Sequence, residues 1–231
     1  MARFRSLKKQ VRELLGSPNW EERLAELDSI EPKVLTGPLF ALLLDRDEQV
    51  RLHAITAFGP AAKRLADQRF EEGRILMRNF MWHMNEESGN LGWGIAEAMA
   101  EAMVCEPRLA KEFNRVLGSY IFCDEECDGN FLDHPPLRRG VFWGLGRLAG
   151  AYPHFVEPVA GFLMKALQEE DNYNRAYAAW VLGIIKCQEA LPALRELAND
   201  TEPVTLYRNR ILESLTVACL VSEAIIRIEE N

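Results

Sequence analysis

The chain has 231 residues, of which 48% are hydrophobic and 27% charged, and its formal net charge is −8 with a pI near 5.2. This composition is typical of an ordinary folded protein and excludes a disordered chain. The negative charge argues against a broad nucleic-acid interface, because such an interface needs a basic face.

The N-terminus and the cysteines favour a cytoplasmic protein. Residues 1–10 lack the apolar run of a secretory signal peptide. No apolar stretch approaches the roughly 20 residues that cross a bilayer. The five cysteines are odd in number and scattered, which favours reduced thiols over a disulfide framework. We therefore expect a cytoplasmic protein that binds no membrane.

Helical periodicity runs along the whole chain, starting with an apolar face at 4–15 that carries Phe4, Val11 and Leu14. A second stripe follows at 20–30. Further helices are predicted at 34–44, 47–58, 70–84, 91–103, 107–122, 137–148, 153–167, 174–185 and 191–197. A long apolar segment at 204–228 ends the chain, and no credible strand run is present. The sequence thus predicts an all-α protein of about six helical pairs.

One pattern returns in several of these helices: a polar start, an Arg, then small and apolar residues at helical spacing. The anchoring arginines are Arg51, Arg138 and Arg175. Arg138 and Arg175 are 37 residues apart, and 37 residues after Arg51 comes Ser88. Ser88 and Arg138 are 50 residues apart, which equals one period of 37 residues plus 13 additional residues. An irregular insertion at 123–135, within the fourth repeat, accounts for the extra residues.

These helices resemble the second helices of HEAT-type repeats, a group that includes phycobilin-lyase-type helical repeat proteins. The resemblance implies a right-handed α-α superhelix, a single solenoid over residues 1–231 in which each repeat buries its apolar face on its neighbours. In such solenoids the second helices line the concave surface. The resemblance identifies an architecture rather than one activity.

One register position carries three tryptophans, five residues after the Arg or Ser anchor and roughly 130–140° from the centre of the core stripe. By the resemblance, these tryptophans and their neighbours one turn away line the concave groove. They either form an aromatic floor for a partner or fill the seams between adjacent repeats. The expected groove residues are Trp93, Trp143, Trp180, Tyr177, Asn90, Glu97, Arg147 and His53.

The anchoring arginines lie about 85° from the core centre, at the boundary of the buried face. In HEAT-type repeats such an Arg pairs with an acidic residue of a neighbouring turn. The resemblance therefore implies a structural ladder of Arg51, Arg138 and Arg175 with acidic residues such as Asp47. Binding of a ligand carboxylate is the alternative role.

The insertion at 123–135 is the best candidate for a special role, because it breaks the period and carries metal-ligand types at close spacing. Cys123, Cys127 and His134 offer two thiolates and one imidazole, which zinc prefers, although the spacing is not a standard one. A solvated acidic loop and a hook for a partner are the alternatives.

No Ser or Cys nucleophile comes with a placed base, and the runs Gly92-Trp-Gly94 and Gly144-Leu-Gly146 are expected inside helices, where they allow close packing. We therefore expect a non-catalytic scaffold or adaptor without a cofactor, which binds a partner protein in the concave groove and binds no nucleic acid. A cofactor-handling lyase or chaperone-like protein is the alternative, and a HEAT-like DNA glycosylase is the third.

Overall fold

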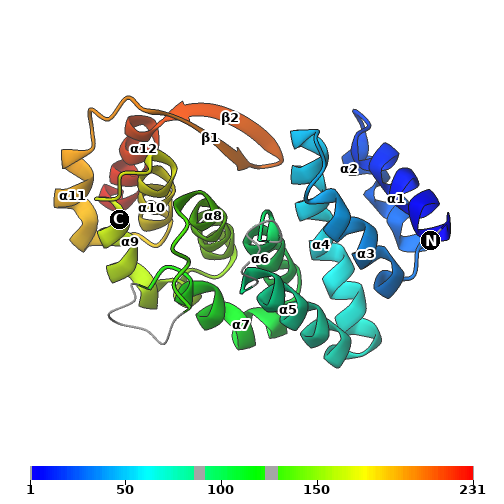
Figure 1. The fold of residues 1–231 in the computed structure, drawn as a ribbon. Coiled ribbons are helices and arrows are strands. Elements are labelled where there is room, and N and C mark those ends of the chain that lie inside the picture. Colours follow the sequence, from blue (N-terminus) through cyan, green and yellow to red (C-terminus); the bar gives the residue numbers. More distant parts are fainter. Residues whose placement is uncertain (1, 86–91, 123–129, 231) are drawn as a thin grey trace. The chain divides into compact units, whose positions relative to one another are not determined.

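The computed structural model describes residues 2–85, 92–122 and 130–230 (Figure 1). The chain divides into two compact units, Met1–Glu112 and Phe113–Asn231. The boundary falls inside helix α7 (Pro107–Ser119). Whether the repeats form one continuous solenoid stays a prediction.

The first unit is built from helices alone in its described residues. Its elements are α1 (Ala2–Leu15), α2 (Trp20–Arg23), a 3₁₀ turn (Leu24–Ser29), α3 (Pro32–Leu42), α4 (Glu48–Gln68), α5 (Phe70–Met84), α6 (Ile95–Cys105) and the start of α7. Helix α4 packs against α3, α5 and α6 (Figure 1). The rings of Phe40 on α3, Phe58 on α4 and Phe80 on α5 pack against one another, with centroids 5.0–5.4 Å apart.

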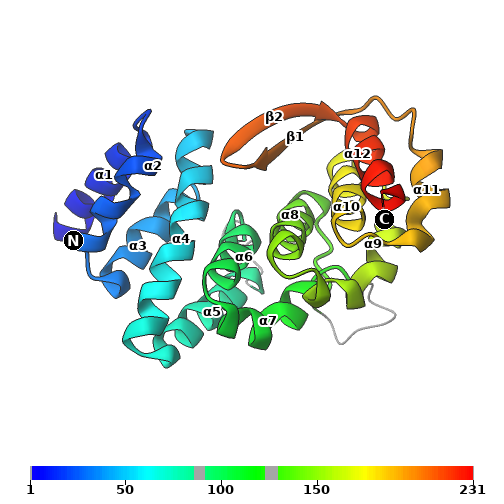
Figure 2. The ribbon, with the colours of Figure 1, turned by 180° about the vertical axis from the view of Figure 1, so that it is seen from behind.

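The second unit places three helices side by side and adds a β-hairpin. Its elements are α8 (Pro135–Ala151), short 3₁₀ turns (Pro153–Phe155, Glu157–Val159 and Gln188–Ala190), α9 (Ala160–Ala166), α10 (Asn172–Ile184), α11 (Leu191–Glu196), β1 (Pro203–Arg208), β2 (Ile211–Thr216) and α12 (Val217–Glu229). Helix α10 packs between α8 and α12 (Figure 2). Its apolar face buries Ala178, Val181 and Leu182 completely.

Polar residues begin the second helix of several pairs. Asp47 accepts a hydrogen bond from the Gln49 N–H at the start of α4. Asp171 accepts one from the Asn174 N–H at the start of α10. Short polar side chains are favoured at this position because they satisfy N–H groups that have no partner within the helix. The sequence therefore determined these helix starts locally.

The hairpin corrects the prediction that the chain, including the apolar segment at 204–228, contains no strand. Val204, Thr205 and Tyr207 favour a strand, and an apolar run of this length cannot be assigned from periodicity alone. The turn residues Asn209 and Arg210 have φ of 52° and 62°. Two left-handed residues produce the tight turn whose twist matches that of paired strands. The two strands pair antiparallel from Pro203 opposite Thr216 to Arg208 opposite Ile211.

The predictions for Gly59 and Gly94 were also wrong. Helix α4 continues through Gly59 and Pro60, where the sequence predicted its end. Gly59 is needed there because an added Cβ would lie 2.6 Å from the Cys105 sulfur on α6. Gly94 lies before α6 rather than inside a helix, with φ of 73°, a conformation that favours glycine.

Candidate functional site

The face formed by α8 and α10 holds β1 through side-chain hydrogen bonds to the strand backbone. Trp143 Nε1 donates to the Tyr207 carbonyl at 2.7 Å. The Tyr177 hydroxyl donates to the Thr205 carbonyl at 2.5 Å, and Asn172 Nδ2 donates to the Pro203 carbonyl at 2.7 Å. These carbonyls belong to alternate residues of β1, so they lie along one edge of the strand. We call this surface, defined by Trp143, Asn172 and Tyr177, the strand-bearing face.

Three predicted groove residues are therefore covered. Trp143, Tyr177 and Trp180 are only 5–8% exposed. Trp143 lies under β1, and its ring stacks on that of Tyr207. Trp180 fills the seam between α8 and α10, because a Cβ added at Gly146 would lie 2.1 Å from its ring. These positions therefore fit the packing alternative rather than an open aromatic floor for a partner. Trp143 packs under the hairpin, and Trp180 packs in a repeat seam.

His53 is a core residue of the first unit rather than a groove residue. It is 8% exposed, and its ring stacks on Trp20 with centroids 3.7 Å apart. Its Nδ1 lies 2.6 Å from the Leu15 carbonyl and must donate, because a carbonyl only accepts. Burial lowers the pKa of His53. This side chain joins α4 to the end of α1.

The remaining predicted groove residues differ in exposure. Trp93 is 41% exposed, just before α6, and Glu97 is partly exposed in the first turn of that helix. Arg147 is partly buried on α8 in the second unit. Asn90 lies outside the described residues. Trp93 and Glu97 are thus the predicted groove residues of the first unit with accessible surface.

Glu97 gives a test of this face by pH. Although the residue is partly exposed, its carboxyl group is buried, and this burial raises its pKa to about 7, against an ordinary value of 4.5. The folded protein therefore holds this proton more tightly than the unfolded chain. The resulting stabilisation is complete below pH 4.5 and is lost as the pH rises through about 7. Denaturant midpoints should show Glu97→Gln more stable than wild type at pH 8 but equal to it at pH 4. A constant difference across this range would contradict the assignment.

The anchoring arginines share one hydrogen-bond pattern that the sequence did not predict. Nη1 of Arg51, Arg138 and Arg175 donates to the carbonyl six residues earlier, at 2.9, 2.8 and 2.8 Å. Each guanidinium therefore ties the preceding loop to its own helix. The predicted acidic partner Asp47 instead caps α4. The carboxylates that the arginines contact are Glu48 for Arg51, Glu169 for Arg138 and Asp200 for Arg175.

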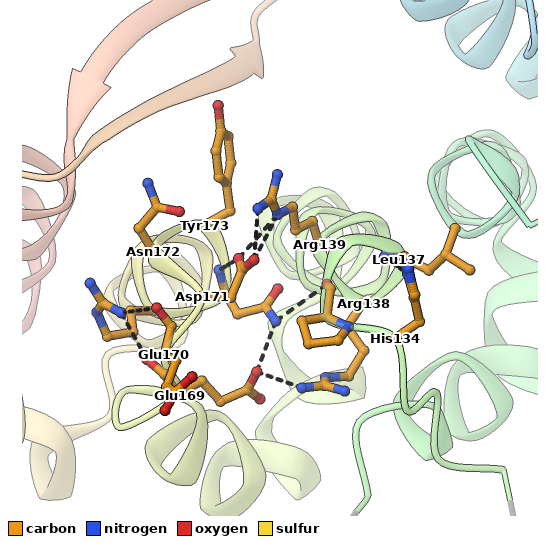
Figure 3. Close-up of polar contacts among 12 residues, drawn as sticks. His134, Leu137, Arg138, Arg139, Glu169, Glu170, Asp171, Asn172 and Tyr173 are labelled. Carbon is orange, nitrogen blue, oxygen red and sulfur yellow. Dashed lines mark hydrogen bonds and ion pairs between the residues drawn. The ribbon is translucent and has the colours of Figure 1, made fainter.

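A second set of ion pairs links consecutive repeats. Arg139 on α8 reaches Asp171, the residue that caps α10, through Nε and Nη2 (Figure 3). Arg12 makes the same two-nitrogen contact with Asp45. Because a guanidinium and a carboxylate match in shape, such paired bonds fix orientation as well as distance. These contacts join residues 32 or 33 apart, so spacing alone did not indicate them.

The metal hypothesis finds no support in the described residues. Across 2–85, 92–122 and 130–230, no group of three or more His, Cys, Asp or Glu is placed to hold a metal ion. Cys123 and Cys127 lie outside these ranges. His134 Nδ1 accepts a hydrogen bond from the Leu137 N–H at the start of α8, at 3.3 Å. Over the same described residues, no helix is long and apolar enough to cross a membrane.

The strand-bearing face gives a further prediction. Trp143→Phe keeps an aromatic ring but removes the donor to the Tyr207 carbonyl, and Tyr177→Phe removes the donor to Thr205. Each change should weaken hairpin docking by about 1 kcal/mol, the net value of one hydrogen bond. Hydrogen exchange of the β1 and β2 amides should accelerate by about fivefold to tenfold in each variant. Unchanged exchange would show that the donors do not hold the strand.

Comparisons with known proteins agree with this architecture. A family model of HEAT repeats matches residues 132–216. No curated protein matches the chain in sequence. Two engineered proteins of known structure are each 16% identical to it. One covers 97% of this chain and 99% of its own at a TM-score of 0.54, and the other covers 97% of each at 0.50. A designed armadillo repeat protein is 15% identical and covers 95% of this chain and 98% of its own, at a TM-score of 0.47.

The helical pairs, the repeated arginine register and the HEAT-repeat match over residues 132–216 agree with one another. The described residues thus form a helical repeat fold, and residues 132–216 match the HEAT-repeat model.

Proposed function

We propose that this chain is a non-catalytic scaffold that binds a partner protein on the faces of its second helices. The observation that carries the proposal is the strand-bearing face, which already holds an extended polypeptide. Its donors contact three alternate carbonyls of β1, the Trp143 ring stacks on that of Tyr207, and the Tyr173 hydroxyl lies near that of Thr205. Such a face recognises the backbone of an extended segment. Repeat proteins use extended surfaces of this kind for binding.

The first unit has an accessible surface of its own. Trp93, which the sequence spacing aligns with Trp143 and Trp180, lies just before α6 and is 41% exposed. An exposed Trp supplies a large contact area at low entropic cost and is enriched where binding energy concentrates. Glu97, in the first turn of α6, is partly exposed. We therefore place the partner's main contact at Trp93 and Glu97.

Site-specific photo-crosslinking in the native cells tests this role. A benzophenone amino acid at position 93 should crosslink one defined partner, which mass spectrometry identifies. The matched control is position 82, because Trp82 is 59% exposed but lies on α5, a first helix. The partner should crosslink from position 93 and not from 82. Trp93→Ala should also abolish partner binding while Trp82→Ala retains it. Equal crosslinking from both positions, or none, would contradict the proposal.

A further inference from the structure

The hairpin uses one of its two long edges to dock on the helices. The outer edge of β1 presents the carbonyls of Pro203, Thr205 and Tyr207 to the strand-bearing face. Its inner edge pairs with β2 over six residues. The opposite edge of the hairpin is therefore the outer edge of β2.

The register identifies which groups that outer edge presents. The two-residue turn makes Arg208 and Ile211 the closing pair, so Ile211, Glu213 and Leu215 direct their N–H and C=O groups toward β1. The alternate residues Leu212 and Ser214 direct theirs away from it. In the part of the chain that the structure describes, neither residue bonds to a backbone group outside the hairpin. The outer edge of β2 thus presents two N–H donors and two C=O acceptors that an added strand could pair with.

This edge lacks most of the features that protect strand edges in proteins. Natural edges carry charged residues, Pro, bulges or covering segments, which prevent pairing with other chains. β2 reads Ile-Leu-Glu-Ser-Leu-Thr and carries no Lys or Pro, and its one charged side chain, Glu213, is paired with Arg208. Ile211 and Leu212 are 63% and 38% exposed. An unprotected, partly apolar edge is suited to pairing with an added strand.

The charge beside the edge favours a basic strand. Two carboxylates, Glu213 on β2 and Glu223 on α12, share the single guanidinium of Arg208 at 2.8 and 2.5 Å. The cluster therefore keeps one net negative charge. A residue added opposite Glu213 would lie on the same face of the sheet as these carboxylates, because cross-strand neighbours share a face. A Lys or Arg at that position would complete the charge balance.

We propose that the outer edge of β2 binds an extended, basic segment of a partner protein by antiparallel strand addition. The segment pairs with Leu212 and Ser214 through its backbone, packs apolar residues on Ile211 and Leu212, and places a Lys or Arg opposite Glu213. A second copy of β2 fits less well. Pairing centred on Glu213 would oppose two like charges, and pairing centred on Ser214 would leave Glu213 opposite Leu215. This inference rests on the proposed scaffold role and names the class of partner.

The test uses the full chain and a fluorescein-labelled peptide, Thr-Val-Thr-Lys-Val-Val, with fluorescence anisotropy as the measurement. Ser214→Pro removes an outward N–H without removing a bond to β1, since edge strands tolerate Pro at such positions. Ser214→Thr is the matched control because it keeps the N–H. Leu212→Lys adds a protecting charge to the edge without changing the backbone. Hydrogen exchange at Glu213 and Leu215 verifies that each variant keeps the hairpin.

The wild type and Ser214→Thr should bind the peptide equally. Ser214→Pro and Leu212→Lys should each bind about tenfold more weakly, as should a peptide with Glu in place of Lys. Binding should also slow amide exchange at Leu212 and Ser214. Equal affinity for all variants, or no binding at millimolar peptide, would overturn the inference. A wild-type dimer that Ser214→Pro dissociates would assign the edge to a second copy and would overturn it as well.

The two proposals fail separately. If the partner still crosslinks from position 93 while the peptide does not bind β2, only the strand-addition inference is overturned. If the peptide binds but no partner crosslinks from position 93, the proposed role of Trp93 is overturned and β2 remains as the binding edge.

Discussion

Gly146→Ala is expected to lower the free energy of unfolding by about 2–3 kcal/mol, because the new methyl group overpacks a buried seam. Three atoms of the Trp180 ring would lie 2.1–2.7 Å from the added Cβ. The ring cannot easily move aside, since it is 8% exposed and packed between α8 and α10. Denaturant unfolding followed by circular dichroism gives the change from the shift in midpoint.

Gly150→Ala on the same helix is the matched control. Nothing lies within 4 Å of its added Cβ, and Gly150 is exposed. Replacing a helical Gly by Ala without a clash should stabilise the protein by about 0.5–1 kcal/mol. The two substitutions should therefore have opposite signs although their chemistry is identical. If Gly146→Ala also stabilises the protein, Trp180 does not fill the seam as described.

Arg138→Met is expected to cost about 3 kcal/mol, because removing one member of a buried ion pair leaves the other uncompensated. The Arg138 side chain is 8% exposed. It donates to the Glu169 carboxylate at 2.7 Å (Figure 3). It also donates to the Leu132 carbonyl at 2.8 Å, and its guanidinium lies 4.7 Å from the centre of the Phe131 ring. Met keeps most of the apolar volume, so the decrease in stability reports the polar interactions. Chemical unfolding measures it.

Arg51→Met at the same register position is the control. Its side chain is 36% exposed, and its closest carboxylate, Glu48, lies 3.6 Å away. The substitution mainly removes the hydrogen bond from Nη1 to the Asp45 carbonyl, so we expect a cost of about 1 kcal/mol or less. Equal costs at both positions would show that burial does not set the contribution of these arginines.

The strand-bearing face and the outer edge of β2 together change where a partner is expected to bind. In the second unit, the aromatic residues that the sequence assigned to a partner instead hold the chain's own strand. The hairpin therefore covers the aromatic surface of α8 and α10 and offers the outer edge of β2 as a binding surface of different chemistry. Trp143 and Tyr177 recognise backbone carbonyls, whereas the edge of β2 offers backbone groups of its own.

The sequence determined most of the helical pairs for local reasons, and its 37-residue spacing holds from α8 to α10, whereas α6 begins later than that spacing predicted. Apolar residues at helical spacing and capping residues such as Asp47 and Asp171 act within one or two turns. The recurrence of Arg51, Arg138 and Arg175 likewise reports a local requirement. Each side chain binds a carbonyl only six residues before it. Patterns of this range are readable without knowing the tertiary structure.

Only the tertiary structure decided which faces are covered. The sequence spacing aligns Trp93 with Trp143, yet Trp93 lies before α6 and is 41% exposed, whereas Trp143 lies inside α8 and is 5% exposed. Trp143 is covered because β1, which starts 60 residues after it, packs over its ring. Helical geometry predicts the direction in which a side chain points from the axis of its helix. It cannot predict whether another segment of the chain packs over that side chain. The strand itself was missed because a short apolar run fits a buried helix and a buried strand equally well until its neighbours are known.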